Sequence, residues 1–334
     1  MEIKEVILKS ERDRVIEFLS SFGLSYRADT EYTVYIEEND EIVGTVSYTG
    51  NIIMELAVSR KMQGENLAAV LVSHITAKLR ELGIYGYKVF TKPEYASIFE
   101  NMGFRPLVKD VEFAAFEGGE SDIASALSAL KRKAVMEIGE LDGDTAAIVI
   151  NGNPFTEGHL ALCEYALSRH KRLLLFVLEE DSSEFSFKER FSLAFLAMRP
   201  YSDRVSVLPS TEYIVSRATF PDYFLHGADE TTRAYAKYDA MIFEKYFMPT
   251  LSISKRYFGS EVTDYMQIYN DTMRSVLADK VEFVERFEKD GRVISAKSVR
   301  ALIKSGKYDE ALLLVPVACR AVMSLIINGK YGNR

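Results

Sequence analysis

The chain has 334 residues, of which 48% are hydrophobic and 27% are charged, a composition typical of a globular protein with about two domains. Its 41 basic and 49 acidic side chains give a net charge of -8, which excludes a general nucleic-acid binder, because such a protein needs basic surface to displace counterions from phosphates. The longest apolar run, 311–318, is too short to span a bilayer and the N-terminus lacks a secretory signal pattern, so we expect a cytoplasmic protein that does not bind membranes.

The first 116 residues alternate between helical and strand patterns and predict a first α+β domain. Apolar residues recur at helical spacing in two segments, 11–22 and 67–82, and the second of these ends at a glycine. The segments between them are rich in β-branched and aromatic residues, and Glu38-Asn39-Asp40 predicts a hairpin turn. The expected strands are 31–36, 42–48, 51–58, 87–91 and a final pair within 104–116.

A linker is expected over 117–144, because this stretch opens with a Gly-rich acidic run, continues as an Ala/Leu/Lys helix and ends at Asp142-Gly143-Asp144. From 145 to 334 the pattern changes. The strands 146–150 and 172–178 are almost wholly apolar and are separated by a helical segment, which indicates parallel strands buried on both faces. Further helices are expected over 187–198, 231–247 and 264–276. The second domain is therefore predicted to be a doubly wound α/β domain with a parallel sheet.

The loop after the first strand of this second domain carries the strongest chemical signal. It contains Gly152, Thr156, Gly158 and His159, and Thr-x-Gly-His opens the next helix. In open α/β sheets, ligands bind beyond the carboxyl ends of the strands, where helix N-termini present free N–H groups. The glycines permit close backbone approach to a phosphate, Thr156 supplies a hydroxyl, and His159 can donate to a phosphate oxygen. A plain turn followed by a surface helix is the alternative, since so short a motif also arises by chance.

The Thr-x-Gly-His arrangement resembles the nucleotidyltransferase superfamily of HIGH-type enzymes. That resemblance implies a second signature, Ile-Ser-x-x-x-x-Arg, late in the domain, and residues 294–300 contain it. Ser295 is expected to cap a helix whose early N–H groups are available to an anion. Lys297 and Arg300 add positive charge at the same helix start. Taken alone, this signature would indicate only an ordinary capped surface helix. Two signatures in the expected order arise by chance far less often.

Longer blocks of sequence narrow the resemblance to one family, [citrate (pro-3S)-lyase] ligase. The blocks that are similar to this family occur in the family's order, at 151–159, 176–183, 185–190, 218–225, 256–261 and 293–300. The first domain resembles a GNAT N-acetyltransferase fold, which that family has and simple adenylyltransferases lack. The residues that carry this second resemblance are 53–58, Gly64, 90–93 and 99–104.

The resemblance implies that acetate is joined to the thiol of a CoA-like prosthetic group on the acyl carrier subunit of citrate lyase. ATP is consumed, acetyl-adenylate is the intermediate, and AMP and pyrophosphate are released. Catalysis then consists mainly of positioning and electrostatic stabilisation, with Mg²⁺ screening the phosphates. No enzyme nucleophile is needed, and no metal-binding residues are predicted. Cys163, one helical turn beyond His159, is expected to be a packed residue.

The same resemblance assigns roles to individual residues. Thr156 and His159 are expected on the phosphates, with Arg300 as the third catalytic residue. The remaining nucleotide-binding residues either shape the first loop or bind the triphosphate from the other side, and they are Gly152, Asn153, Phe155, Gly158, Ser295, Lys297, Ser298 and Arg256. Arg256 and Glu261 are the weaker candidates, because 256–261 also fits a structured loop. Arg190 fits a structural and a catalytic role equally well.

Two departures from the family pattern qualify these expectations. The GNAT pyrophosphate loop falls at 61–66, where Glu65 adds a negative charge and Asn66 replaces a small residue. The first domain is therefore expected to dock the CoA-like arm of the carrier without transferring acetyl from acetyl-CoA, and a pure scaffold role stays open. His226 stands where many relatives are expected to have lysine, and it replaces a cation only when protonated.

Two other functions remain as alternatives. The first is an adenylyltransferase for a cofactor precursor such as phosphopantetheine, although Glu179-Glu180-Asp181 would repel a phosphorylated acceptor. The second is a non-catalytic module that binds a carrier protein and has a degenerate nucleotide site.

Overall fold

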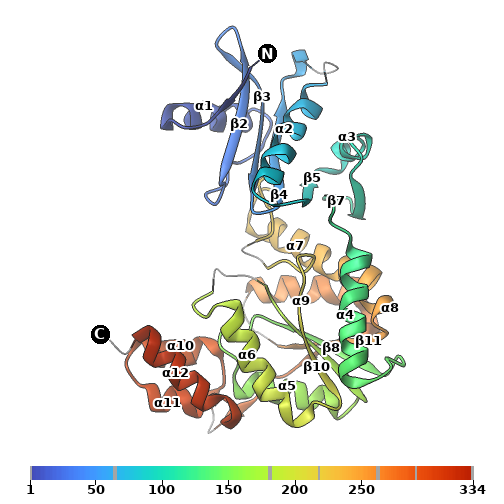
Figure 1. Cartoon of the computed structure of the whole chain (residues 1–334), viewed down its shortest axis with the longest axis vertical. Helices are drawn as coiled ribbons and strands as arrows, with labels where there is room; N and C mark the ends of the chain where they lie inside the picture. The colour runs from blue at the N-terminus through green and yellow to red at the C-terminus, as the bar shows by residue number, and fades with distance from the viewer. Residues whose placement is uncertain are drawn as a thin grey trace. The chain divides into compact units, whose positions relative to one another are not determined.

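A computed structural model describes residues 2–62, 66–179, 183–216, 219–260, 264–289 and 292–331. The chain forms two compact units (Figure 1). Unit 1 comprises Met1–Asp122 and Phe220–Ala234, and unit 2 comprises Ile123–Thr219 and Tyr235–Arg334. The functional boundaries 1–116, 117–144 and 145–334 stay a prediction, because they rest on motifs and not on compactness.

Unit 1 is built on a seven-stranded sheet with the order β1-β2-β3-β4-β5-β7-β6. Neighbouring strands are antiparallel, except that β4 and β5 are parallel. Two predicted features, the hairpin (β2 and β3) and the final strand pair (β6 and β7), are confirmed. The elements are β1 (Ile3–Glu5), α1 (Lys9–Ser20), β2 (Tyr32–Glu38), β3 (Glu41–Thr49), β4 (Ile52–Val58), α2 (Leu67–Glu81), β5 (Gly86–Thr91), α3 (Ala96–Asn101), β6 (Arg105–Lys109) and β7 (Ala114–Gly119).

The two parallel strands of unit 1 pair over a short stretch only. Ile52 is paired with Lys88 and Ile53 with Val89, and no further pair follows along these two strands. Two residues later Glu55 adopts a left-handed backbone with φ 58°, where the pairing of β4 with β3 shifts register as at a β-bulge. A cavity of about 830 Å³ lies beside the later part of β4, where Leu56, Ala57 and Val58 line it together with α2 and α3.

The segment Phe220–Ala234 is an integral part of unit 1 although it is remote in sequence. The Phe220 ring lies 5.6 Å from that of Phe90 and 6.4 Å from that of Phe113, centroid to centroid. The Tyr223 hydroxyl donates to the backbone oxygen of Phe90 at 2.6 Å. Arg27 donates to the backbone oxygen of Phe220 at 3.0 Å. Aromatic packing and buried hydrogen bonds therefore hold this segment against unit 1.

Unit 2 contains a five-stranded sheet with the order β10-β9-β8-β11-β12, in which all pairs are parallel. The predicted doubly wound parallel sheet is confirmed. Its main elements are α4 (Ile123–Ile138), β8 (Thr145–Ile150), α5 (Glu157–Leu167), β9 (Arg172–Val177), α6 (Phe187–Met198), β10 (Val205–Pro209), α7 (Ala228–Ile242, which starts in unit 1), α8 (Met248–Thr250), β11 (Ile253–Gly259), α9 (Asp264–Leu277), β12 (Val281–Val284), α10 (Ala296–Lys304), α11 (Tyr308–Leu313) and α12 (Arg320–Tyr331), with a small hairpin of β13 (Glu288–Lys289) and β14 (Arg292–Val293).

Both faces of this sheet are buried, which explains why β8 and β9 are apolar throughout. Alternate residues of β9, including Leu173 and Leu175, join a core with α5, α6 and the C-terminal helices. Phe176 points to the opposite face, where its ring meets Phe243 and Phe247 at 6.3 Å and 5.7 Å. Strands covered on both sides lose the polar alternation of a half-exposed sheet.

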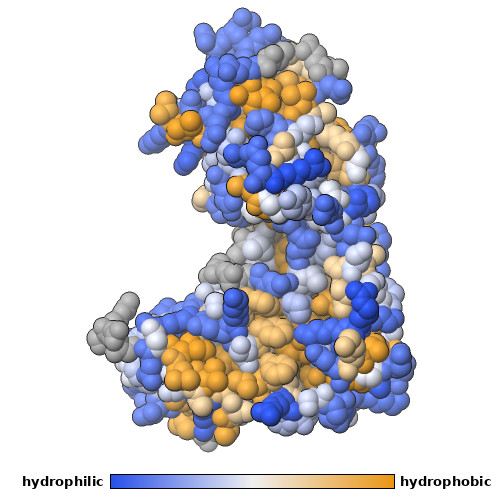
Figure 2. Space-filling model, viewed as in Figure 1, coloured by the Kyte–Doolittle hydropathy of each residue, from blue (hydrophilic) through white to orange (hydrophobic). Residues whose placement is uncertain are grey.

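The helices α10 to α12 pack on the same core and also present apolar residues to solvent. Val299, Met323 and Ile327 are buried in this core. On the face that Figure 2 shows, hydrophobic residues gather over these helices, and Leu313 and Leu325 are exposed. Within the described part of the chain, no helix combines the length and the apolar character that crossing a bilayer requires.

We predict that Phe220→Ala destabilises unit 1 locally, because it removes a fully buried ring from an aromatic cluster, a change that costs about 3–5 kcal/mol. Hydrogen exchange followed by mass spectrometry will show faster exchange in peptides around Phe90 and Phe113. The matched control is Phe195→Ala in unit 2, since Phe195 is 55% exposed. Equal exchange in both variants would contradict the assignment of this segment to unit 1.

Candidate active site

A cavity of about 760 Å³ lies at the carboxyl ends of the unit 2 strands. Its walls come from the last residues of β8 and β11, from the residues that follow β8 and β12, from α7 and α9, and from the start of α10. The sheet order reverses between β8 and β11, and the ends of the strands flanking such a reversal are where open α/β sheets bind ligands. All predicted site residues except Phe155 and Ser298 line this cavity. Their roles toward a nucleotide stay predictions.

The loop after β8 is held by a hydrogen bond to the side chain of Asn153. Gly152 has φ +62°, and a Cβ there would lie 3.1 Å from Ile150. The Asn153–Pro154 peptide bond is cis. Asn153 accepts from the backbone N–H of Phe185 through its side-chain oxygen at 3.1 Å. The loop is thus tied to the segment that precedes α6.

Arg190 is the buried anchor of this region. Its guanidinium donates to the backbone oxygens of Phe185 at 3.0 Å, Asn151 at 2.7 Å and Leu178 at 2.8 Å, and the residue is fully buried. These bonds join the ends of β8 and β9. Of the two roles that the sequence left open for Arg190, catalytic and structural, they favour the structural one.

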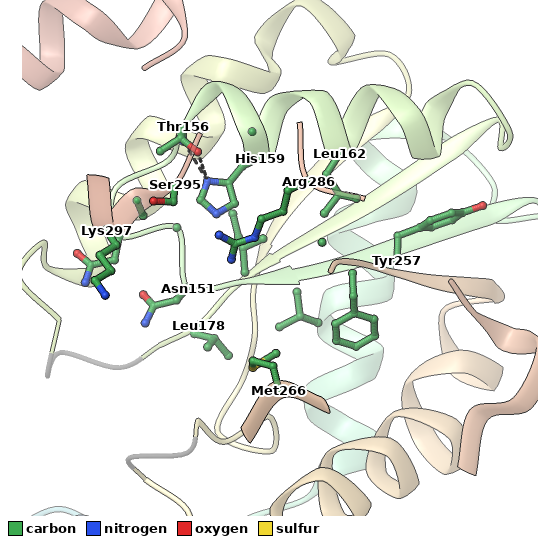
Figure 3. Close-up of a pocket in the computed structure, with 18 of the residues that line it drawn as sticks. Asn151, Thr156, His159, Leu162, Leu178, Tyr257, Met266, Arg286, Ser295 and Lys297 are labelled. Carbon is green, nitrogen blue, oxygen red and sulfur yellow. Dashed lines mark hydrogen bonds between the residues drawn. The ribbon is translucent and has the colours of Figure 1, made fainter. Parts of the chain in front are cut away.

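Thr156 and His159 form one hydrogen-bonded unit at the start of α5 (Figure 3). The backbone N–H of Thr156 donates to Nδ1 of His159 at 3.0 Å, and the Thr156 hydroxyl lies 2.9 Å from the same nitrogen. Because Nδ1 accepts, the hydrogen-bond network assigns the ring proton to Nε2. The imidazole is half-buried, and the protein atoms around it remove enough hydration to lower its pKa to about 4, with the charge of Arg286 acting in the same direction.

Gly158 is the position at which the two sequence signatures meet. A Cβ on this residue would lie 3.0 Å from the backbone oxygen of Ile294 and 3.7 Å from its Cβ. Ile294 directly precedes the N-cap of α10, so a larger residue at 158 would push the second signature away from the first. In the structure, the group that approaches Gly158 closely is the backbone of Ile294.

The start of α10 has the predicted capping geometry. Ser295 is the N-cap, and its hydroxyl accepts from the backbone N–H of Ser298 at 3.0 Å. Lys297 is exposed at the edge of the cavity. Arg300 donates to the backbone oxygen of Asn153 and lies 3.9 Å from the carboxylate of Glu184. It therefore connects α10 directly to the loop after β8.

Arg256 lies within β11, so 256–261 is not simply a structured loop, although Glu261 is outside the described residues. Its two terminal nitrogens donate to the two oxygens of Asp239, both at 2.9 Å, and Tyr269 donates to the same carboxylate at 2.6 Å. Both partners of this ion pair are about 2% exposed. Arg256 thus reaches the cavity as half of a neutralised buried pair.

Sequence reasoning missed Arg286, which lines the cavity two residues beyond β12. Burial lowers the pKa of its guanidinium, which still stays protonated at neutral pH. β12 has four residues and alternates only weakly in polarity, so its carboxyl end was not recognised. The signal that was available is positional: a basic side chain two residues after a parallel strand.

Other sequence candidates lie away from this cavity. Cys163 is fully buried in the core, as expected of a packed residue, and burial raises the pKa of its thiol. His226 is exposed and belongs to unit 1. Within the GNAT loop, Gln63, Gly64 and Glu65 lie outside the described residues. No cluster of three or more His, Cys, Asp or Glu side chains suited to a metal ion occurs among the residues that the structure describes.

These features define the class of protein. Unit 2 is a parallel α/β unit in which both predicted signatures face one cavity, and unit 1 is an α+β unit whose parallel strands β4 and β5 pair over two positions. Residues 145–322 match the family described as citrate lyase ligase C-terminal domain, and residues 13–117 match the acetyltransferase (GNAT) domain family.

The relatives cover nearly the whole chain. It is 33% identical to [citrate [pro-3S]-lyase] ligase of Klebsiella pneumoniae, over 92% of this chain and 91% of that protein. The protein of the same name from Escherichia coli K12 is 29% identical over 90% of this chain and 87% of its own length, and that of Haemophilus influenzae 29% over 95% and 96%. The chain therefore belongs to the citrate lyase ligase family. The predicted family, the GNAT-like first domain and the class of enzyme, a ligase, are confirmed.

We predict that His159 stays neutral down to about pH 5, because its pKa is lowered to about 4 from the ordinary 6.5. The unfolded chain takes up this proton near pH 6.5 and the folded chain only near pH 4. The contribution to the free energy of unfolding is therefore complete above pH 6.5 and is lost as the pH falls toward 4. NMR of ¹⁵N-labelled imidazoles will follow the titration, with the unfolded chain as control. A midpoint near 6.5 in the folded chain would contradict the burial argument.

Proposed function

We propose that this chain acetylates the thiol of the CoA-like prosthetic group on the citrate lyase acyl carrier subunit. In this reaction ATP activates acetate, acetyl-adenylate is the intermediate, and AMP and pyrophosphate are the products. The observation that carries the proposal is the convergence of Thr156, His159, Ser295, Lys297 and Arg300 on one cavity in a member of the citrate lyase ligase family. A reaction that consumes ATP also fits the cytoplasmic location expected from the sequence.

The first step is transfer of the adenylyl group to acetate. A carboxylate oxygen of acetate forms a bond to the α-phosphorus, and the bond from that phosphorus to the bridging oxygen breaks, with its electron pair leaving on pyrophosphate. Negative charge increases on the phosphoryl oxygens during this step. The neutral His159 donates from Nε2, while Lys297 and the capped start of α10 bind the departing phosphates. Arg300 keeps α10 and the loop after β8 in register.

The second step needs no nucleophile from the enzyme. The thiolate of the carrier attacks the carbonyl carbon of acetyl-adenylate, AMP leaves, and the thiol proton passes to solvent. Both cysteines of the chain are buried, and burial raises the pKa of each thiol, to about 12 for Cys319. They are thus poor nucleophiles, which supports direct capture by the carrier.

Mg²⁺ fits this site if it enters bound to the phosphates of the substrate. Asp239, a buried carboxylate that lines the cavity, is already bound by Arg256 and Tyr269. Mg²⁺ commonly binds through substrate phosphates with few protein ligands. When bound there, it would screen the charge of the triphosphate. The residues that face those phosphates are Ser295 and Lys297.

The cavity of unit 1 is proposed to hold the CoA-like arm of the carrier. It measures about 830 Å³ and is lined largely by apolar side chains, among them Leu56, Val72 and Phe99, with Ala68 and Ala69 of α2 leaving space. A chain of methylene and amide groups suits such a cleft. Because Glu65 and Asn66 depart from the GNAT pattern, we propose binding of the arm without acetyl transfer from acetyl-CoA.

We predict acetate-dependent release of pyrophosphate from MgATP, with acetyl-adenylate trapped by hydroxylamine as the hydroxamate. His159→Ala will lower kcat for this release by about 10²–10³-fold, since it removes a donor to the reacting phosphoryl group, and far-UV circular dichroism will stay unchanged. His74→Ala is the control, because His74 lies on α2 in unit 1.

The alternatives give different results in the same assay. Turnover of phosphopantetheine without turnover of acetate would replace the proposal with a cofactor adenylyltransferase. Binding of the carrier that survives His159→Ala, with no turnover in either form, would indicate a non-catalytic binding module. Full activity in His159→Ala would remove His159 from the mechanism.

We predict that Ala69→Trp separates the two steps. Ala69 lines the unit 1 cavity, so a tryptophan there blocks the arm and lowers carrier acetylation by about tenfold or more, the factor that corresponds to about 1.4 kcal/mol of lost binding. Acetate-dependent pyrophosphate release will not change. Val70→Trp is the matched control, because the neighbouring Val70 is 47% exposed. Equal carrier acetylation in both variants would contradict a role of this cavity.

A further inference from the structure

Arg286 is held in place at the end of two strands. Its Nε donates to the backbone oxygen of Ser260, directly after β11, at 3.0 Å. The backbone N–H of Ser260 in turn donates to the oxygen of Val284, the last residue of β12, at 2.8 Å. The side chain is half-buried in the cavity. Its position is therefore set by the sheet, and it loses little conformational entropy when a ligand binds.

Arg286 and His159 face the same part of the cavity. Figure 3 shows the Arg286 guanidinium directed toward the imidazole, on the side away from Thr156. The guanidinium has donors only. Nδ1 of His159 accepts from Thr156, so Nε2 on the other side of the ring carries the proton. Two donors cannot hydrogen-bond to each other, whereas an anion placed between them accepts from both.

The position of this pair along the cavity separates it from the start of α10. In the view of Figure 3, Ser295 and Lys297 lie to the left of His159, whereas the Arg286 side chain enters from the right, the side of Tyr257, and ends beside the imidazole. The α10 start thus suits the phosphates that leave. The region of Arg286 continues into the less polar part of the cavity, which suits a nucleoside.

We propose that Arg286 is a catalytic residue that binds the α-phosphoryl group of the nucleotide together with His159. This inference rests on the proposed function and deepens it. In the transfer step an acetate oxygen bonds to the α-phosphorus, and pyrophosphate leaves with the electron pair of the broken bond. No proton moves, so the step needs fixed positive charge at the phosphoryl oxygens. Arg286 supplies that charge, and His159 supplies a neutral donor.

The test compares Arg286→Gln with Lys297→Gln in the full-length chain, with AMP and inorganic pyrophosphate as probes in isothermal titration calorimetry. AMP contains the α-phosphate and pyrophosphate mimics the leaving group. We expect Arg286→Gln to weaken AMP by about tenfold and pyrophosphate much less, and Lys297→Gln to do the reverse. In the acetate assay, Arg286→Gln should lower kcat by about 10²–10³-fold with a smaller change in the KM for ATP.

The Arg286→Lys variant tests whether the loss in Arg286→Gln is purely structural, because lysine keeps the positive charge but lacks the planar guanidinium. It should restore part of the AMP affinity and of kcat. Unchanged AMP binding in Arg286→Gln, or an equal loss for AMP and pyrophosphate, would overturn the assignment to the α-phosphoryl group, as would an Arg286→Lys variant no better than Arg286→Gln. A wild-type chain that binds AMP through Arg286 but releases no pyrophosphate with acetate would overturn the proposed function alone.

Discussion

The site depends on the close approach of two backbone segments at Gly158. A side chain there would meet the oxygen of Ile294 at 3.0 Å, so the absence of a Cβ lets the loop after β8 and the start of α10 face one cavity. Arg300 crosses the same junction to the oxygen of Asn153. Arg190 also holds this loop, because its guanidinium donates to the backbone oxygens of Asn151 and Leu178. The glycine permits the contact, and the two arginines make it rigid.

Charge in this protein is organised locally and not by the net balance. The chain carries a net charge of -8, yet the cavity combines Lys297, Arg286 and a helix start. Arg256 contributes little field there, because Asp239 neutralises it at 2.9 Å. Burial and Arg286 together keep His159 uncharged. An anionic ligand thus meets a few fixed cations and one neutral donor, which limits the cost of holding positive charge in an empty site.

Sequence reasoning identified the parts of the site that are encoded locally. The apolar strand β8, the Thr-x-Gly-His turn and the Ser295 cap each depend on neighbouring residues, and each lies where the pattern indicated. The strands β10, β11 and β12 were not predicted. β11 contains Arg256, and a charged residue argues against a buried strand. The pairing with Asp239, which makes this burial possible, lies elsewhere in the sequence. Arg286 becomes visible only when the ends of β11 and β12 are adjacent. Partners remote in sequence leave no periodic signal.

The segment Phe220–Ala234 gives the chain an unusual order of assembly. During synthesis, residues up to 122 leave the ribosome with Phe90 and Phe113 still lacking the ring of Phe220. Unit 1 is complete only once residue 234 has been translated, after three of the five strands of the unit 2 sheet, so its folding overlaps with the synthesis of unit 2. The same division of unit 1 into two sequence segments limits which recombination events give a folded protein. A recombination event that exchanged the first 122 residues alone would bring in a unit whose aromatic packing surface was matched to another chain's insert, and the exchange would succeed only if both segments moved together.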